Sequence, residues 1–380
     1  MSTKILHFID SGGLYGAESV ILNLSREMQT DDTYTPVVGC IVSHPDEISD
    51  LYDKTIEFGV DALKLVIRNS FLFVDIPRAA RRLKKNGISL IHSHGYKPSV
   101  FGFLIRLATG IPIIATCHLW FLQEKIPVKM RVMIMLELLS YRLFSTIVAV
   151  SRAIKVILVE HGVAENKIEM IKNGIVLSDY SSLSDKIVDQ LRKDLQLKHG
   201  EFCFLNVARL THQKAQCHIV SVARMLKEAG EKVKFFIVGE GPLRDDLQQQ
   251  IIDNGVQDCV RLLGFRQDVN DLLQVADVFI LPSIDEGMPM ALLEAVASKT
   301  PILATPVGDI TKLIQDGRSG VIVKVDDIDD LFDGALRLIS SAELRQSCAE
   351  FAWEKMHKEY SSLAMYRSYI EIYDGILGCG

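Results

Sequence analysis

The sequence has no apolar stretch long enough to cross a membrane. Its most apolar long segment, 130–150, is broken by Arg131, Glu137 and Arg142, whereas a spanning helix needs about 18 or more apolar residues in series. The segment 4–9 has the pattern of a strand, and no charged, apolar and small-residue regions precede it in the order of a signal peptide. We therefore expect a cytoplasmic protein that does not span a membrane.

Paired cysteines and an excess of positive charge are also missing. The seven cysteines are scattered, with no C-x-x-C pair or zinc-ligand spacing, so we expect them to be reduced and mostly packed in cores. Lys and Arg total 42 against 48 Asp and Glu, a net charge of −6, which argues against nucleic acid as a partner. Any bound anion must be held by a local cluster of cations.

The length of 380 residues predicts two domains, because single hydrophobic cores rarely grow that large. Short apolar runs alternate with amphipathic stretches in both halves, which is the rhythm of a parallel α/β sheet. We predict a Rossmann-like domain over 1–178, a hinge within 177–200, a second Rossmann-like domain over 179–360, and a helix over 361–380 that packs back on the first. Strands are expected at 4–9, 36–42, 62–67, 88–92, 112–117, 146–150, 202–207, 233–238, 260–263, 277–281, 301–304 and 321–323.

Two glutamates, Glu286 and Glu294, stand eight residues apart after the predicted strand at 277–281. Eight helical residues of 100° each return to about 80° from the starting direction, so both carboxylates can lie on one side. Carboxylates placed in this way can accept hydrogen bonds from two hydroxyls of one sugar ligand. The alternative is a carboxylate favoured by a helix dipole together with an unrelated surface glutamate.

An ordered set of motifs extends over nearly the whole chain. With these motifs the sequence resembles the retaining glycosyltransferases of family four, which have the GT-B fold of two facing Rossmann-like domains with an interdomain cleft. Glu286 and Glu294 match the E-x7-E motif of that family. The other motifs are Gly12-Gly-Leu-Tyr-Gly-Ala-Glu18, Asn173-Gly174, Ala208-Arg209 with Lys214, Gly239-Glu-Gly-Pro242, Val260-Arg-Leu-Leu-Gly264, Ala276-Asp-Val-Phe-Ile-Leu-Pro-Ser283, Leu293-Glu-Ala295, Pro301 and Val307-Gly308.

The resemblance implies a donor site in the second domain. Arg209 and Lys214 would stabilise the departing nucleoside diphosphate, a role that a metal ion fills in other enzymes. They would act with Glu286 and His118 as the catalytic residues, and no cofactor or metal is expected. Three places depart from the family pattern. Ala215 stands where a glycine usually follows the lysine, Ser298-Lys-Thr300 stands where a glycine usually precedes Pro301, and Asp309 and Lys312 stand where a second glycine and a glutamate usually follow Gly308. The implied donor-binding residues are Gly13, Gly239, Gly241, Arg266, Glu286, Gly287, Met288 and Glu294.

The resemblance also implies an acceptor site in the first domain, with Gly12, Tyr15 and His94 as binding residues. Glycines after a strand expose backbone N–H groups at a helix start, where they can bind a phosphate or carboxylate; a tight turn is the alternative. His118 ends the strand at 112–117, at the sheet edge where such folds place ligands. A packed core histidine is the alternative for this residue.

The expected reaction is transfer of a sugar from a UDP- or GDP-sugar to a saccharide or lipid-linked acceptor, in bacterial polysaccharide or lipopolysaccharide synthesis. In a front-face substitution, the acceptor attacks the sugar on the same face from which the phosphate departs. Such a reaction would need no protein nucleophile. Two alternatives stay open: a sugar-nucleotide epimerase of the same fold, and a catalytically silent binding or scaffold protein, suggested by Lys299, Asp309 and Lys312. Asp327-x-Asp329 is interpreted as a helix cap rather than a metal site.

The segment from Trp120 to Phe144 is apolar but carries Lys125, Lys129, Arg131 and Arg142. Basic amphipathic helices bind anionic lipid, and similar segments in the family lie on the inner face of the membrane. Peripheral membrane contact is therefore one interpretation of this segment. Core packing with a solvated face is the other.

Overall fold

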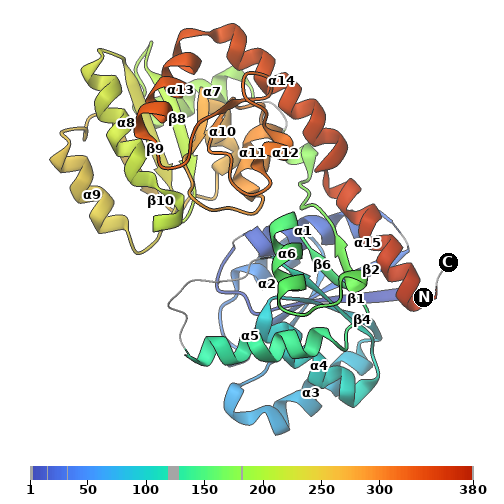
Figure 1. The fold of residues 1–380 in the computed structure, drawn as a ribbon. Coiled ribbons are helices and arrows are strands. Elements are labelled where there is room, and N and C mark those ends of the chain that lie inside the picture. Colours follow the sequence, from blue (N-terminus) through green and yellow to red (C-terminus); the bar gives the residue numbers. More distant parts are fainter. Residues whose placement is uncertain (1–2, 15, 32, 119–127, 181–182, 379–380) are drawn as a thin grey trace. The chain divides into compact units, whose positions relative to one another are not determined.

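The computed structural model describes residues 3–378 except 15, 32, 119–127 and 181–182. The chain divides into two units: unit 1 is Met1–Gly174 with Ser362–Gly380, and unit 2 is Ile175–Ser361. Each unit is built on a parallel sheet with helices on its two faces (Figure 1). The segment 177–200, where a hinge was predicted, contains η3 (Leu177–Tyr180) and α7 (Asp185–Asp194) and belongs to unit 2.

The sheet of unit 1 has the strand order β3-β2-β1-β4-β5-β6-β7, and every pairing in it is parallel. Six of its strands were predicted within a few residues, because each is an apolar run buried in the sheet. β7 was missed because only the first of its three residues is buried. The strands are β1 (Thr3–Ile9), β2 (Tyr34–Val42), β3 (Asp61–Val66), β4 (Ile88–His94), β5 (Ile113–Cys117), β6 (Ile147–Ala149) and β7 (Ile168–Met170).

Helices of unit 1 cover the sheet in two layers. α3, α4 and α5 pack in succession over the larger core cluster, and α1 and α15 pack on each other. The C-terminal helix α15 thus lies in unit 1, where Tyr369 and Tyr373 are buried. The helices are α1 (Gly16–Gln29), α2 (Asp50–Glu57), η1 (Asn69–Phe71), α3 (Leu72–Lys85), α4 (Tyr96–Thr109), α5 (Val128–Tyr141), α6 (Arg152–Glu160), η2 (Glu165–Lys167) and α15 (Ser362–Leu377).

The sheet of unit 2 has the strand order β10-β9-β8-β11-β12-β13, again parallel throughout. Buried side chains of β8, β9 and β11 form the centre of its core, in which the rings of Phe204 and Phe235 stack at 4.6 Å. The strands are β8 (Phe202–Val207), β9 (Val233–Val238), β10 (Val260–Gly264), β11 (Val278–Leu281), β12 (Ile302–Ala304) and β13 (Val321–Ile322).

In unit 2, α8, α9 and α13 lie on one side of the sheet and α10, α11 and α14 on the other (Figure 1). The side chain of Asp327 caps α13 by accepting a hydrogen bond from Asp330 N, which is the role the sequence predicted for that aspartate. The helices are η4 (His212–Lys214), α8 (Gln216–Glu228), α9 (Arg244–Asp253), α10 (Val269–Val275), α11 (Met290–Ala297), α12 (Ile310–Leu313), α13 (Ile328–Ser340) and α14 (Ala342–Glu359).

In each sheet the chain adds its first strands toward one edge and its later strands toward the other edge. This topological switch point lies between β1 and β4 in unit 1 and between β8 and β11 in unit 2. Doubly wound sheets bind ligands beyond the carboxyl ends of the strands at such a point. The predicted residues His94, Arg209 and Glu286 end or follow these strands. No helix within the described part of the chain is long and apolar enough to cross a membrane.

Candidate active site

Glu286 lies in the loop that leaves the carboxyl end of β11, and neighbouring backbone holds this loop on two sides. On one side, Ile284 N donates to Gln213 O at 2.8 Å. On the other, a Cβ added to Gly308 would lie only 2.2 Å from Glu286 O, and Gly308 has a φ of +57°. Only glycine allows both this conformation and this approach, so the position of Glu286 is fixed by the backbone of two other loops.

Lys214 and Glu286 form an ion pair, with Lys214 Nζ 2.6 Å from Glu286 Oε1. Ser283 Oγ donates to the same oxygen at 2.8 Å. The side chains are 17% and 6% exposed, so solvent screens the pair far less than it screens a surface pair. The structure therefore brings together two of the predicted catalytic residues, and an ammonium has three protons, of which one contacts Glu286.

Arg209 is exposed and lies in the loop between β8 and η4, which packs against the turn after β9. A Cβ on Gly239 would lie 2.0 Å from Ala208 O, and one on Gly241 would lie 2.3 Å from Leu210 O. Leu210 N also donates to Glu240 O at 3.0 Å. Gly239 and Gly241 therefore fix the backbone on both sides of Arg209, a role in addition to the predicted one of admitting a ligand.

Ala215, which departs from the family pattern, adopts the left-handed conformation that glycine favours. Its φ is +49° and its ψ is +38°, and the residue is buried between η4 and α8. Alanine can take this conformation at a cost of about 1–2 kcal/mol. The departure therefore keeps the backbone geometry of the turn after Lys214.

Glu294 lies on α11, half-buried, and no described residue forms a hydrogen bond or ion pair with its carboxylate. Burial without a partner raises the pKa of Glu294 to about 7. Of the other residues predicted to bind the donor here, Met288 is buried, and Gly287 O accepts a hydrogen bond from Asp309 N at 2.8 Å.

Arg266 follows β10 and forms a double hydrogen bond with its near neighbour Asp268. Nε donates to Oδ1 at 2.7 Å and Nη2 donates to Oδ2 at 2.5 Å. The pair with Asp268 raises the pKa of the guanidinium and lowers the pKa of the carboxyl group. A carboxylate thus already occupies two donors of the arginine that was predicted to lie near the nucleotide base.

Lys299, Asp309 and Lys312, which suggested a catalytically silent protein, each interact with a neighbouring side chain. Lys312 pairs with Asp309, with Nζ 2.7 Å from Oδ1, so the two added charges offset each other. Lys299 follows the end of α11 and precedes β12, at the amino ends of the strands and opposite the edge of Glu286. Its ammonium lies 4.8 Å from the ring centre of Trp353.

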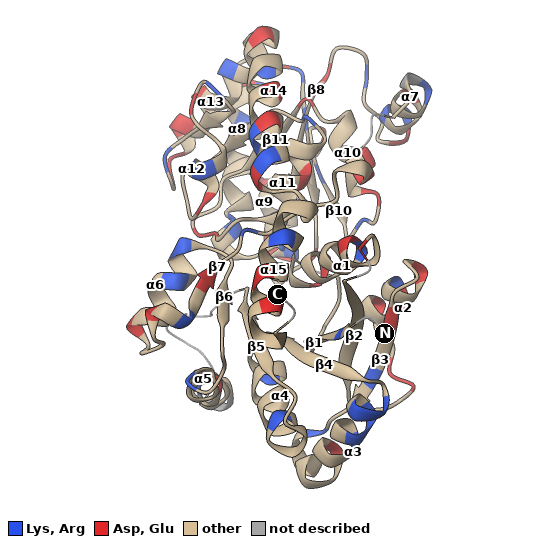
Figure 2. Cartoon of the chain, turned by 90° about the vertical axis from the view of Figure 1, so that its right-hand side faces the viewer, with Lys and Arg blue, Asp and Glu red and all other residues tan. Residues whose placement is uncertain are grey.

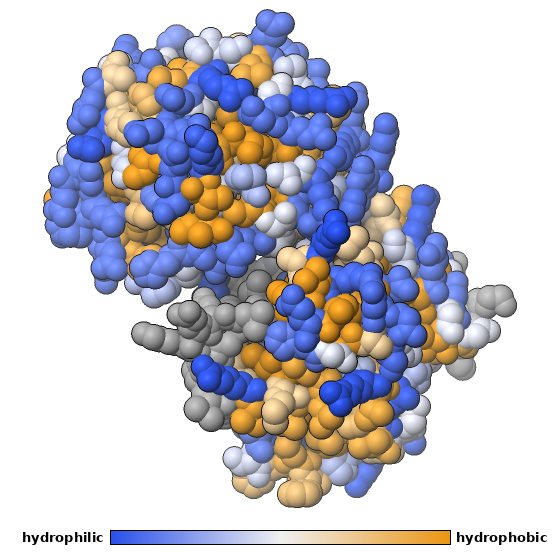
Figure 3. All heavy atoms as spheres, in the orientation of Figure 1, coloured by the Kyte–Doolittle hydropathy of each residue, from blue (hydrophilic) through white to orange (hydrophobic). Residues whose placement is uncertain are grey.

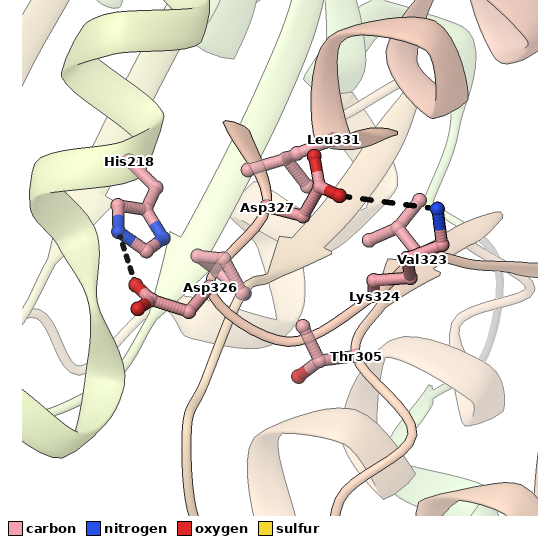
Figure 4. A pocket seen from close by; sticks show the side chains of 8 residues that line it. His218, Thr305, Val323, Lys324, Asp326, Asp327 and Leu331 are labelled. Atoms are coloured by element: carbon pink, nitrogen blue, oxygen red, sulfur yellow. Dashed lines mark ion pairs between the residues drawn. The ribbon is translucent and has the colours of Figure 1, made fainter. Parts of the chain in front are cut away.

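A shallow pocket lies beside the loop after β11 (Figure 4). Its wall contains His218, whose Nε2 lies 3.1 Å from Asp326 Oδ1, and also Pro282 and Thr305. Thr305 Oγ1 donates to Ser283 O at 2.5 Å. Two residues that line the pocket thus also belong to the Glu286 loop or hold it: Pro282 is part of the loop, and Thr305 is hydrogen-bonded to it.

A stripe of polar side chains crosses the sheet of unit 1. His7 and His92 are paired in register, as are His94 and Thr116, and alternate residues of a strand share a face. His94 Nδ1 lies 2.9 Å from His118 Nε2, and His94 Nε2 lies 3.2 Å from His7 Nδ1. His118, predicted as catalytic, and His94, predicted to bind the acceptor, are therefore in direct contact, and His7 contacts His94 in turn.

Burial keeps these histidines neutral. It lowers the pKa of His7 to about 3 and that of His118 to about 4, and it holds the pKa values of His92 and His94 well below the usual value. Ring nitrogens of His7, His92 and His94 lie within 4.8 Å of one another, a spacing that could hold a metal ion. Hydrogen bonds account for the cluster, because His92 Nδ1 lies 2.8 Å from Tyr373 OH and His92 Nε2 lies 2.7 Å from Thr116 Oγ1.

The glycine loop after β1 is held by Ser11. Ser11 Oγ donates to Gly13 O at 2.8 Å, and Gly13 has a φ of +152°. A Cβ on Gly12 would meet nothing within 4 Å, so packing does not require glycine there. Tyr15, predicted to bind the acceptor, lies outside the described residues.

Sequence reasoning missed His7 as part of this stripe. The sequence places it 85 positions before His92, in a strand with no motif of its own. The available signal was the strand order of a doubly wound sheet, which sets the first and fourth strands side by side. With that order, histidines at matching positions of β1 and β4 are expected to be neighbours.

Two family models match consecutive parts of the chain. The model described as Glycosyltransferase Family 4 matches residues 15–179, and the model described as Glycosyl transferases group 1 matches residues 187–355. The chain is similar to the UDP-Gal:alpha-D-GlcNAc-diphosphoundecaprenol alpha-1,3-galactosyltransferase of Escherichia coli. The two proteins are 29% identical over 263 residues, and this matched region covers 67% of each of them. The chain is also 30% identical over 223 residues to the amylovoran biosynthesis glycosyltransferase AmsK of Erwinia amylovora. This matched region covers 57% of this chain and 52% of AmsK.

The fold is shared with a solved structure along the whole chain. HepE of Anabaena, solved in complex with UDP-glucose, superposes with a TM-score of 0.84 at 19% identity, covering 98% of this chain and 99% of HepE. At that identity the likeness shows the architecture, which is the GT-B fold. With the two family models and the relatives above, it shows that the chain belongs to the family-four glycosyltransferases.

Proposed function

We propose that this protein is a retaining, metal-independent transferase that moves a sugar from a nucleotide diphosphate sugar to an acceptor. The observation that supports it best is the Lys214–Glu286 pair at the switch point of unit 2. Arg209 lies on a loop fixed by Gly239 and Gly241 beside the same strand. Two cations at one sheet edge can bind a diphosphate without a metal ion.

In the proposed reaction the bond between the anomeric carbon and the phosphate oxygen breaks first. Negative charge then grows on the diphosphate, where Arg209 and Lys214 stabilise it, and such stabilisation is commonly the largest catalytic contribution. The acceptor oxygen bonds to the anomeric carbon on the face that the phosphate leaves, so configuration is retained. Its proton passes to the departing phosphate oxygen, and no protein nucleophile takes part.

Glu286 would orient Lys214 and accept a hydrogen bond from a sugar hydroxyl. Glu294 would accept hydrogen bonds from a second part of the donor, and its carboxylate, with which no described residue pairs, supports this assignment. We propose a UDP-sugar as donor. HepE was solved with UDP-glucose, and the E. coli relative is named for UDP-Gal.

We further propose a lipid-linked acceptor in bacterial surface polysaccharide synthesis, with unit 1 in contact with the membrane surface. On and just after α5, apolar side chains are exposed, with Met135 at 64%. Figure 3 shows hydrophobic side chains gathered over α5 and α4, and Figure 2 shows Lys and Arg on α3 and α4. Such a surface binds anionic lipid. Its exposed apolar residues are Val132, Met135, Leu136, Leu139 and Leu143.

A flotation experiment tests the membrane contact. Vesicles with anionic lipid should carry the wild-type protein, whereas vesicles of neutral lipid should not. The double variant Met135→Glu/Leu139→Glu should stay in solution, and Ile252→Glu, on exposed α9 of unit 2, should float like wild type. Equal flotation of all three proteins, or none with anionic lipid, would remove this part of the proposal.

The catalytic proposal is tested with purified protein, a panel of UDP-, GDP- and ADP-sugars, and a lipid diphosphate-linked N-acetylglucosamine as acceptor. We expect turnover with a UDP-sugar, unchanged by EDTA, and a product whose anomeric configuration by NMR equals that of the donor. Inverted configuration would refute retention, and loss of turnover in EDTA would refute metal independence. Nucleotide binding without transfer would favour the silent protein, and a changed sugar without acceptor would favour the epimerase.

A further inference from the structure

A continuous line of ring nitrogens runs from helix α1 to the carboxyl end of β5. His7 Nε2 lies 3.3 Å from Met28 Sδ, His7 Nδ1 lies 3.2 Å from His94 Nε2, and His94 Nδ1 lies 2.9 Å from His118 Nε2. Met28, His7 and His94 are buried, and His118 is half-buried. The line thus joins the interior of unit 1 to the end of the strand where a ligand is expected.

The sulfur of Met28 fixes the direction of every hydrogen bond in this line. A thioether carries no proton and can only accept, so His7 Nε2 must be the donor. A neutral imidazole has one N–H, and burial keeps these rings neutral. His7 Nδ1 therefore accepts from His94 Nε2, and His94 Nδ1 accepts from His118 Nε2.

The neighbouring ring of His92 cannot reverse this order. Both of its nitrogens contact hydroxyl oxygens, of Tyr373 and Thr116, and hydroxyls can donate or accept. His92 lies against His94, with ring centres 4.2 Å apart. It therefore packs beside the line without supplying a proton to it.

We propose that Met28, His7 and His94 are positioning residues that hold His118 as the Nε2–H tautomer, so that His118 Nδ1 is a hydrogen-bond acceptor for a sugar hydroxyl. No described residue forms a hydrogen bond with Nδ1. A nitrogen lone pair attracts a hydroxyl proton and repels the oxygens of a phosphate, so this position recognises the sugar rather than the diphosphate. The choice of a sugar rests on the proposed function, whereas the tautomer does not.

The tautomer can be measured without any ligand. Long-range proton–nitrogen NMR spectra of protein labelled with ¹⁵N-histidine distinguish a protonated from an unprotonated ring nitrogen. In wild type at pH 7 we expect His118, His94 and His7 all to carry their proton on Nε2. A proton on His118 Nδ1, or a doubly protonated His118, would overturn the proposal.

The role of the sulfur is tested with Met28→Leu, which keeps the side-chain volume close to that of methionine. Without an acceptor at its end, the line loses its fixed direction, and His118 should show a mixture of tautomers. Met365→Leu is the matched control, because Met365 is also buried in unit 1 and its sulfur accepts from Gly174 N at 3.3 Å, outside the line. Spectra of His118 that are alike in both variants would refute the role of Met28.

Binding separates the tautomer from the identity of the ligand. Loss of one hydrogen bond should weaken UDP-glucose binding up to about tenfold in Met28→Leu, while UDP binding stays as in wild type. Met365→Leu should bind both as wild type does. If the spectra change as expected but the ratio of UDP-glucose to UDP affinity does not, the sugar-hydroxyl assignment is wrong. If neither compound binds the wild type, the proposed function fails while the spectra still decide the tautomer.

Discussion

Lys214 and Glu286 stand 72 positions apart in the chain and meet at 2.6 Å, with one oxygen of Glu286 shared between Lys214 and Ser283. The two residues follow β8 and β11, which are neighbours at the switch point of the sheet. The loop that carries Glu286 is also hydrogen-bonded to the turn that carries Lys214, because Ile284 N donates to Gln213 O. The pair therefore connects the two sides of the candidate donor site and is part of the fold as well as of the proposed chemistry.

Removing Lys214 should destabilise unit 2 and abolish transfer. Lys214→Ala leaves the buried carboxylate of Glu286 without its cation, which costs about 1–3 kcal/mol, and it removes half of the charge available to the diphosphate. Thermal unfolding and turnover with a UDP-sugar measure the two effects. In the double variant Lys214→Ala/Glu286→Ala, stability should recover in part while transfer stays lost. Strictly additive losses would show that the pair is not coupled.

The turn after β9 supports the backbone beside Arg209, and nucleotide binding should therefore depend on it. Gly241→Ala places a Cβ 2.3 Å from Leu210 O, so the backbone next to Arg209 must move, at a cost of about 1–3 kcal/mol. We expect a lower Tm and a loss of the thermal shift that UDP produces. Gly375→Ala, where a Cβ meets nothing within 4 Å, is the control. Unchanged UDP binding in Gly241→Ala would separate this turn from Arg209.

Much of the sheet could be predicted because buried parallel strands are continuous apolar runs. β8 and β9 begin and end at the predicted residues, since every position of these strands is at least partly buried. β7 could not be found in this way, because two of its three residues are exposed. Its place in the sheet depends on pairing with β6, which is a long-range contact and not a local pattern.

The candidate site was predictable only in its residue types and rough places. Motif order identified Lys214 and Glu286, yet nothing local to either residue indicates that they touch. The same holds for His7, whose partners His94 and Met28 lie on other elements. By contrast, Arg266 and Asp268 are two positions apart, and their pairing could have been expected from proximity alone.

Lys299 shows how a departure from a family pattern can be tested for strain. Its φ is +56°, at the end of α11, where glycine is favoured. Lys299→Gly should be more stable than Lys299→Ala by about 1 kcal/mol, because both lose the contact with Trp353 and only alanine keeps a Cβ. That difference corresponds to a Tm higher by about 2–4 °C. Equal melting temperatures would show that the left-handed backbone costs nothing here.

Glu294 should make the stability of unit 2 depend on pH. Its pKa is raised in the folded state from 4.5 to about 7, so between these values the folded protein holds a proton that the unfolded chain has lost. The stability that Glu294 contributes is therefore greatest below pH 4.5 and falls as the pH rises to about 7, by on the order of 3 kcal/mol for a shift of this size. Thermal unfolding between pH 4.5 and pH 8 should show this decline.

Glu294→Gln should lack this decline and exceed wild type in stability at pH 8, because its amide does not ionise. Glu354→Gln, which changes an exposed glutamate on α14 of the same unit, should follow wild type. If Glu294 accepts hydrogen bonds from donor hydroxyls, a bound nucleotide sugar favours the charged carboxylate. The rise in Tm that the ligand causes should then grow from pH 5 to pH 8 in wild type and stay constant in Glu294→Gln. A ligand effect with the same pH dependence in both proteins would place the donor away from Glu294.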